Sequence, residues 1–459
     1  MIRNDKMVET ASPKIKKVLF YTGSSYGFGS WTIWQVYEIA QVYPTILLAE
    51  KLDSEIEGIL KNKKFFPKLQ RIIPVRYSSD SLKAMVKNNR TLYRRAIEVV
   101  KDYKPDVIVT GGLVYPFPLY LRRIGQREGV LNVCPFSPRF FTSEKIRSRV
   151  KLISAHLDRP RFLPFFISLF WTNLKKQLGH FLFYWILPLA VGERPFRKEP
   201  GCILFNEIAG RSADYYVSFL KQDYDSALQD GMPFEKLYNL SQPYPARYEE
   251  ILDFLKKKFL LTKANKFKNK EKILTLMWEN SEIGIKRKKS KLISKKELSE
   301  QRTKIIRLII EKLQGWKIFI KPHPGTKHHE FSEMKKTLGL ISSNIEIVDP
   351  LECAEKYILI SDVIVGLPPT SSTLYTASLI CPEKPILSLD FEDELLGDGY
   401  KNFNGVEYID NEEKFINILE LIRNNKYSKS NHKLKEEWPV GKDFSSFREL
   451  LEYLVKKGR

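Results

Sequence analysis

A histidine held between two prolines is the most specific chemical feature of the sequence. Residues 319–326 read FIKPHPGT, so an apolar run ends directly at Lys321 and His323. The flanking prolines fix the backbone and exclude a regular helix there. An ammonium group and an imidazole delivered to a strand end are placed to donate hydrogen bonds to a phosphate. We therefore predict that Lys321, His323 and Gly325 bind a phosphate, and that His328 and His329 are surface residues.

A run of four hydroxyl residues forms a second candidate site. Residues 361–374 read SDVIVGLPPTSSTL, which is typical of a strand, a tight turn and a helix start. Helix capping requires only one hydroxyl, whereas a phosphate at a helix N-terminus can use several hydroxyl and N–H groups. The run therefore favours an anion-binding role over capping alone, and its members are Thr370, Ser371, Ser372 and Thr373.

A glycine-rich turn follows the first expected strand. Its small residues Gly23, Ser24, Ser25 and Gly27 would let a substrate approach the backbone before the first helix begins. The glycine spacing is not that of the dinucleotide fingerprint. The turn is thus either a substrate-side loop or a structural turn.

These candidate residues require strands and helices in alternation, and the sequence supplies two such series. Strand-like and helix-like segments alternate from residue 16 to about 135 and again from residue 272, which predicts two doubly wound, Rossmann-like α/β domains. We expect an N-terminal domain over 1–250, a lysine-rich linker over 251–272, a C-terminal domain over 273–440, and a C-terminal helix over 441–459 that could cross back. Ligands of such domains bind at the carboxyl ends of the strands, here facing a central cleft.

Composition excludes some classes of protein. With 459 residues, 43% hydrophobic and 28% charged, the chain is a globular protein long enough for two cores. Its net charge of +22 requires an anionic partner such as nucleic acid, a membrane surface or phosphorylated substrates. The four cysteines are scattered, so we expect neither a disulfide nor a zinc site. The first residues lack the apolar core of a secretion signal, and we expect a cytoplasmic protein.

The stretch 161–192 is the most apolar part of the chain and interrupts the alternation as a helical insertion over about 140–200. Each of its two apolar runs is shorter than the roughly 20 residues that a membrane-spanning helix needs. Aromatic residues flanked by Lys and Arg suit attachment in the plane of an anionic membrane. A buried helical hairpin or dimer contact and a membrane-spanning hairpin are the alternatives.

The KPHP segment, followed some 40 residues later by a strand and the Ser371-Ser372 helix start, resembles the donor half of GT-B glycosyltransferases that build bacterial surface polysaccharides. The most similar patterns are those of sialyl-, polysialyl- and Kdo transferases, which use CMP-sugars, and of CDP-glycerol transferases. The resemblance spans roughly residues 210–395. It implies that His323, Ser371 and Ser372 contact the nucleotide phosphate. Tyr375 and Thr376 stand where many UDP- and GDP-sugar enzymes carry a ribose-binding Glu, which favours a CMP- or CDP-type donor.

No DxD-type metal motif stands out in a cleft-facing loop of the sequence. The resemblance implies a metal-independent, inverting glycosyltransferase with no cofactor. Its substrates would be a nucleotide-sugar and a lipid-linked glycan or glycolipid, at the inner face of the cell membrane, and Gly23 to Gly27 would lie on the acceptor side. The base must be a carboxylate or imidazole, and the candidates are Glu279, Glu282, His323, His156 and Asp158.

A CDP-glycerol-type transferase and a sugar-nucleotide epimerase of the same fold are the alternatives. No nucleic-acid recognition motif stands out. The sugar, the acceptor and the oligomeric state stay open.

Overall fold

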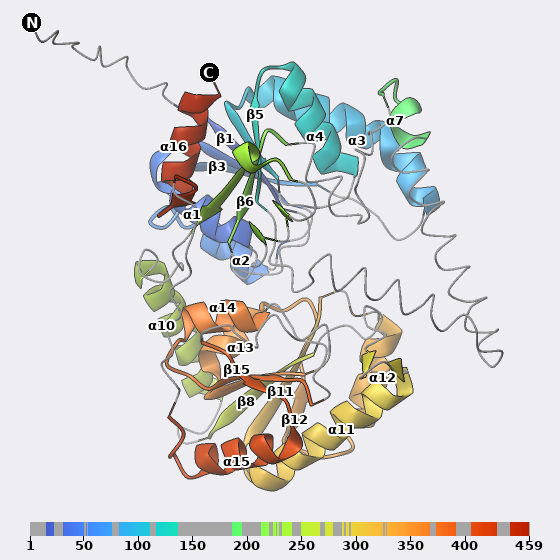
Figure 1. The fold of residues 1–459 in the computed structure, drawn as a ribbon, viewed down its shortest axis with the longest axis vertical. Coiled ribbons are helices and arrows are strands. Elements are labelled where there is room, and N and C mark those ends of the chain that lie inside the picture. Colours follow the sequence, from blue (N-terminus) through green and yellow to red (C-terminus); the bar gives the residue numbers. More distant parts are fainter. Residues whose placement is uncertain are drawn as a thin grey trace, which may run out of the picture.

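The computed structural model of the chain contains two parallel β-sheets, each with helices packed on its faces (Figure 1). The described residues are 15–22, 31–49, 52, 54–75, 82–110, 116–135, 186–194, 213–219, 224–225, 227–228, 232–240, 249–266, 271–278, 287–288, 291–292, 295–324, 326, 328–367, 373–391, 405–428 and 441–458.

The first sheet contains, among the described residues, eight parallel strands in the order β16-β7-β6-β5-β4-β1-β2-β3. Strands such as VLFYT and VIVT are buried at every position because helices cover both faces of the sheet. The strand bounds are β1 Val18–Thr22, β2 Thr45–Ala49, β3 Leu69–Pro74, β4 Val107–Thr110, β5 Leu131–Pro135, β6 Tyr215–Ser218, β7 Leu237–Leu240 and β16 Asp443–Phe444.

The second sheet contains, within the same described ranges, six parallel strands in the order β12-β11-β8-β13-β14-β15. A short antiparallel pair, β9 with β10, lies outside it. The bounds are β8 Ile273–Trp278, β9 Arg287–Lys288, β10 Lys291–Leu292, β11 Lys317–Pro322, β12 Ile345–Ile347, β13 Val363–Gly366, β14 Ile386–Leu389 and β15 Glu407–Ile409.

Helices connect successive strands, as the alternation predicts. Those before the second sheet are α1 Trp31–Val42, α2 Ser54–Leu60, α3 Leu82–Tyr103, α4 Pro116–Arg127, α7 Leu187–Leu189, the 3-10 turn η3 Phe234–Lys236 and α10 Glu249–Lys266. The later ones are α11 Lys295–Lys312, α12 His328–Leu338, α13 Ala354–Ile360, α14 Thr373–Ile380, α15 Glu412–Arg423 and α16 Phe447–Lys457. Within the described residues, none of these helices is both long and apolar enough to cross a membrane.

The segment predicted as a lysine-rich linker over 251–272 is largely a helix, α10 Glu249–Lys266. Helix α10 buries Ile251, Leu252, Leu255 and Phe259, whose spacing places them on one side of the helix. Because lysines lie between these apolar residues, the composition of the segment does not reveal its apolar side. α10 packs on α13 of the second domain and also contacts the first, where the Phe65 and Phe254 rings lie 4.8 Å apart.

The C-terminal segment returns to the first domain. β16 pairs with β7, so the edge strand on this side of the first sheet comes from the C-terminal segment and not from β7. α16 packs against α1 and buries the ring of Phe447 near Phe20 of β1, with 6.2 Å between ring centroids. The chain therefore crosses between the two domains at α10 and again before β16 (Figure 1).

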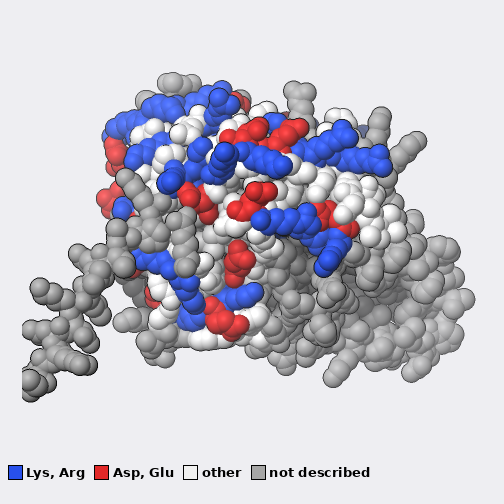
Figure 2. Space-filling view, turned by 90° about the horizontal axis from the view of Figure 1, so that it is seen from above, with Lys and Arg blue, Asp and Glu red and all other residues white. Residues whose placement is uncertain are grey.

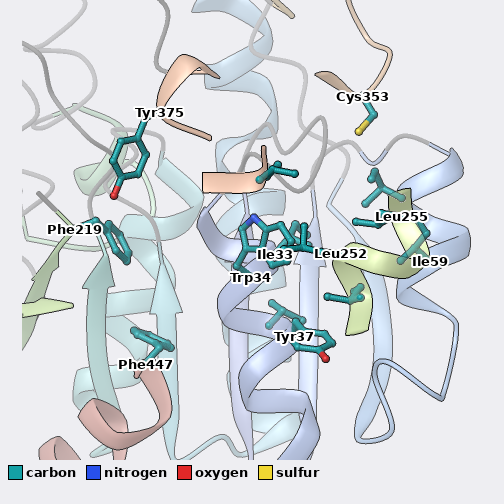
Figure 3. Packing of buried hydrophobic residues seen from close by; sticks show 14 of the residues in the cluster. Ile33, Trp34, Tyr37, Ile59, Phe219, Leu252, Leu255, Cys353, Tyr375 and Phe447 are labelled. Carbon is teal, nitrogen blue, oxygen red and sulfur yellow. The ribbon is translucent and has the colours of Figure 1, made fainter. Parts of the chain in front are cut away.

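One continuous apolar cluster joins the two domains. Leu255 of α10 lies near both Ile59 of α2 and Cys353 beside α13 (Figure 3). In the same cluster, Phe219 follows the carboxyl end of β6 and lies near Tyr375 in the first turn of α14 (Figure 3). The carboxyl edge of the first sheet is thus turned toward the helix start that follows β13.

The described cysteines are Cys134, Cys353 and Cys381, and all three are buried free thiols. Of the apolar stretch 161–192, residues 186–192 belong to the described part and form α7 and the turn after it. The predictions for residues 161–185 fall outside the described residues.

Candidate functional site

The expected phosphate-binding segments follow two strands that flank β8. Met277 of β8 pairs with Lys321 of β11 on one side and with Gly366 of β13 on the other. Beyond these pairs, the His323 amide donates to the Trp278 carbonyl at 2.8 Å, and the Leu367 amide donates to the Met277 carbonyl at 3.1 Å. Since neighbouring strands lie about 4.8 Å apart, β11 and β13 are separated by about 10 Å. Both segments therefore leave the sheet beside the end of β8.

This edge is also where the connections of the second sheet reverse direction. From β8 the chain continues to β11 and β12 on one side, and then to β13, β14 and β15 on the other. Doubly wound domains bind ligands at such a reversal, outside the carboxyl ends of the strands. The strand order thus makes the end of β8 a candidate binding position independently of the motifs.

Gly366 allows α14 to begin close to the end of β13. A Cβ atom at this position would lie 2.5 Å from a methyl carbon of Leu374 in the first turn of α14. A larger residue would displace the Leu374 side chain, which packs directly on this glycine. Thr373 is the first residue of α14 and is half-buried, whereas Thr370, Ser371 and Ser372 lie outside the described residues. Their phosphate role stays a prediction.

His323 occupies a turn that is fixed by backbone hydrogen bonds. Its carbonyl accepts from the Thr326 amide at 2.9 Å, so the chain folds back directly after Pro324. The His323 side chain is half-buried, which leaves part of the imidazole accessible to a ligand. His328 and His329, at the start of α12, are exposed as the sequence predicts.

Lys321 does not have the position expected of a phosphate ligand. It is only 4% exposed, and its ammonium donates to the carbonyls of Pro322 and Pro350 at 2.9 and 2.7 Å. Burial lowers the pKa of Lys321 to about 8, although nearby Cys353 and Glu355 oppose this shift. Lys321 therefore joins the end of β11 to the β12–α13 connection.

The lowered pKa of Lys321 predicts a specific dependence of stability on pH. Between about pH 8 and the usual value of 10.5, the unfolded chain binds a proton that the folded chain has lost. The free energy of unfolding of the native protein should therefore rise with pH relative to Lys321→Met, by about 3 kcal/mol over this window. Urea unfolding of both proteins at several pH values measures it, and a constant difference would contradict a buried ammonium.

Two features near His323 could not be recognised from the sequence. Arg302 of α11 is 1% exposed, and its guanidinium lies 4.5 Å from the ring centroid of Trp278, which ends β8. This stacked pair spans 24 positions of sequence, so spacing does not reveal it. The Thr326 hydroxyl is buried and has no hydrogen-bond partner in the described structure. A buried group without a partner beside a candidate site is suited to accept or donate a bond to a ligand.

The carboxyl edge of the first sheet also carries buried polar residues. Thr22 ends β1 and Thr110 ends β4, and the connections of this sheet reverse between these two strands. The fully buried guanidinium of Arg122 donates to the Thr110 hydroxyl and, at 3.5 Å, to the Cys134 sulfur. The predicted substrate-side residues Gly23, Ser24, Ser25 and Gly27 lie outside the described residues.

The remaining predicted site residues are Gly325, Glu279 and Glu282, and all three lie outside the described residues together with His156 and Asp158. Within the described part, no group of three or more His, Cys, Asp and Glu side chains is arranged to hold a metal ion. The geometry thus brings His323, Trp278 and Thr326 to one strand edge and leaves the base as a prediction.

One protein family and several solved structures resemble the chain. Residues 220–390 match the family model of alpha-2,8-polysialyltransferases, which is less than half of the chain and contains β8, β11, β13 and His323. No curated protein matches the sequence.

Among solved structures, UDP-GlcNAc 2-epimerase of Methanocaldococcus jannaschii in complex with UDP-GlcNAc and UDP is 12% identical, with 96% of this chain and 99% of that chain covered and a TM-score of 0.54. UDP-GlcNAc 2-epimerase of Neisseria meningitidis bound to UDP-GlcNAc is 11% identical, with 89% and 93% covered and a TM-score of 0.54. At these identities the likeness shows the fold alone: the chain has the GT-B architecture of two Rossmann-like domains.

Proposed function

We propose that the protein is a glycosyltransferase that uses a nucleotide-activated sugar. The observation that carries the proposal is the polysialyltransferase match over residues 220–390, because this segment includes both phosphate-binding candidates and the strand edge where they meet. In this reaction an acceptor hydroxyl attacks the sugar carbon while the bond to the nucleotide phosphate breaks. The half-buried His323 and the hydroxyls of residues 370–373 stabilise the charge that develops on that phosphate.

A CMP-sugar is the favoured donor. The matched family is named for polysialic acid transfer, and Tyr375 and Thr376 replace a ribose-binding Glu in the corresponding helix. Both side chains are buried in the first turns of α14. We further propose an inverting reaction without a metal ion, with Glu279 or Glu282 as the base. The acceptor would be a lipid-linked surface glycan, reached by peripheral attachment at the cytoplasmic face of the membrane.

A panel of CMP, CDP, UDP and GDP tests the donor by thermal shift of the purified protein in EDTA. A ligand at a hundred times its Kd stabilises the folded state by about 2.7 kcal/mol, and we expect this from CMP. A polyol-phosphate transferase also releases CMP, so CDP-glycerol is added to the panel, and stabilisation by CDP-glycerol that exceeds that by CMP would favour this alternative. Stabilisation by UDP alone would contradict the CMP-sugar proposal.

The GT-B neighbours that act as UDP-GlcNAc 2-epimerases give a second candidate function. An epimerase converts its sugar nucleotide without an acceptor. Incubation of the protein with UDP-GlcNAc alone therefore separates the two candidates. Formation of the 2-epimer under these conditions would overturn the transferase proposal.

A further inference from the structure

The short helix α7 and its N-cap residue present two large aliphatic side chains to solvent. Ile186 is 39% exposed and Leu189 is 55% exposed. They lie three positions apart on one turn, which the Ala190 amide closes by donating to the Ile186 carbonyl at 2.9 Å. The other exposed large apolar side chains in the described ranges are dispersed, at Phe234, Leu340, Leu351, Leu421 and Tyr453. α7 is therefore a local apolar projection.

This projection is held firmly on the first domain. Leu187, between the two exposed residues, is 1% exposed, and its carbonyl accepts from the buried Asn89 side chain of α3 at 2.8 Å. Four residues after Leu189, the buried carboxylate of Glu193 accepts hydrogen bonds from Arg127 of α4 and from the Tyr93 hydroxyl of α3. The Glu193 carboxylate is buried, whereas the Arg127 side chain is 54% exposed. The chain on both sides of the turn is thus fixed while Ile186 and Leu189 point outward.

Three exposed arginines adjoin, in sequence, the residues that hold the projection. Arg90 and Arg94 directly follow Asn89 and Tyr93, the two α3 residues that hold the α7 segment, and Arg194 follows Glu193. These three side chains are exposed and form no ion pair within the described residues. Figure 2 shows one face of the molecule, on whose described part Lys and Arg cover more of the surface than Asp and Glu. The apolar turn is therefore accompanied by three exposed cations, each one position after a residue that anchors it.

We propose that α7 docks onto an anionic lipid bilayer, with Ile186 and Leu189 inserted at the headgroup boundary and Arg90, Arg94 and Arg194 on lipid phosphates. Aliphatic side chains together with exposed arginines match this boundary, where an apolar layer lies under anionic groups. The residues directly before Ile186 read FLFYW, a composition suited to the membrane interface. This inference rests on the proposed function, because it assigns the surface that brings a lipid-linked acceptor to the enzyme.

Flotation of the full-length protein with vesicles tests the docking surface. The native protein should bind phosphatidylcholine vesicles weakly and vesicles that also contain phosphatidylglycerol strongly. Ile186→Ser with Leu189→Ser should lower binding to the mixed vesicles by about tenfold or more. The matched control is Leu340→Ser with Leu421→Ser, which removes exposed apolar side chains of the second domain and should leave binding unchanged.

A variant without two of the arginines measures the contribution of charge separately from that of the apolar side chains. Arg90→Gln with Arg94→Gln should weaken binding to the mixed vesicles by about fivefold per arginine and leave the weak phosphatidylcholine binding unchanged. Lys335→Gln with Lys336→Gln on α12 removes the same charge from an exposed helix of the second domain and should have little effect.

Equal losses of vesicle binding in the test and control variants would overturn the docking proposal. Native protein that does not bind the mixed vesicles would also overturn it. A dimer in lipid-free buffer that the α7 variant abolishes would assign the surface to a second copy instead. CMP binding is measured on the same proteins. If the native protein binds CMP but not the vesicles, the docking proposal is wrong and the donor proposal stands. If it binds the vesicles but not CMP, the donor proposal is wrong and the docking proposal stands.

Discussion

Replacing His323 with alanine is expected to lower kcat/KM for sugar transfer by about 10²- to 10³-fold, the usual effect of removing one preorganised donor from a developing anion. The turn should survive the change, because it is closed by the His323 amide to the Trp278 carbonyl and by the Thr326 amide to the His323 carbonyl. These bonds use backbone atoms, which alanine retains. The loss would then come from the imidazole itself.

Two further variants show whether the effect is specific. His328→Ala removes an exposed histidine of α12 and should leave kcat/KM within twofold of the native value, about 0.4 kcal/mol. His323→Asn keeps an N–H donor and should recover part of the lost activity. Calorimetric titration with CMP gives a readout independent of turnover. Unchanged turnover and CMP affinity in His323→Ala would remove the phosphate role from this residue.

The sequence is sufficient to predict the two-domain fold because buried parallel strands carry a strong local signal. β8, β11 and β13 are short apolar runs bounded by polar or turn residues, and the structure places them side by side at the centre of the second sheet. The positions of His323 and the α14 start at the carboxyl edge follow from that order. Local pattern thus determines which strands exist and which ends carry the site.

Packing across the chain was not predictable in the same way. β16 has two residues, and these form a strand only because they pair with β7, roughly two hundred positions earlier in the chain. Lys321 and His323 are two positions apart at the end of one strand, so alternation alone assigns both to the same face. The β12–α13 connection covers Lys321, whose ammonium reaches the Pro350 carbonyl, and leaves His323 half-buried. No periodicity in the sequence reports that difference.

Phe447→Ala is expected to lower the free energy of unfolding by about 3–5 kcal/mol, a large part of the total stability of a domain. Phe447 is 1% exposed and packs against β1 through Phe20. It is also the first residue of α16, where its amide and that of Arg448 donate to the Glu38 carboxylate of α1 at 3.3 and 3.0 Å. The substitution keeps these backbone bonds and removes the ring from the core, so the cost is that of a cavity.

The region that loses stability in Phe447→Ala shows whether α16 stabilises the first domain specifically or the whole protein. Because α16 packs on the first domain, hydrogen exchange in Phe447→Ala should accelerate in peptides from β1 and α1 and change little in β8 and β11. Leu421→Ala on α15 truncates a side chain that is 43% exposed and should change stability by less than about 0.5 kcal/mol. Faster exchange confined to the second domain would contradict the packing of the C-terminal helix on β1 and α1. Acceleration in the first domain would show that the last residues of the chain stabilise its first strand.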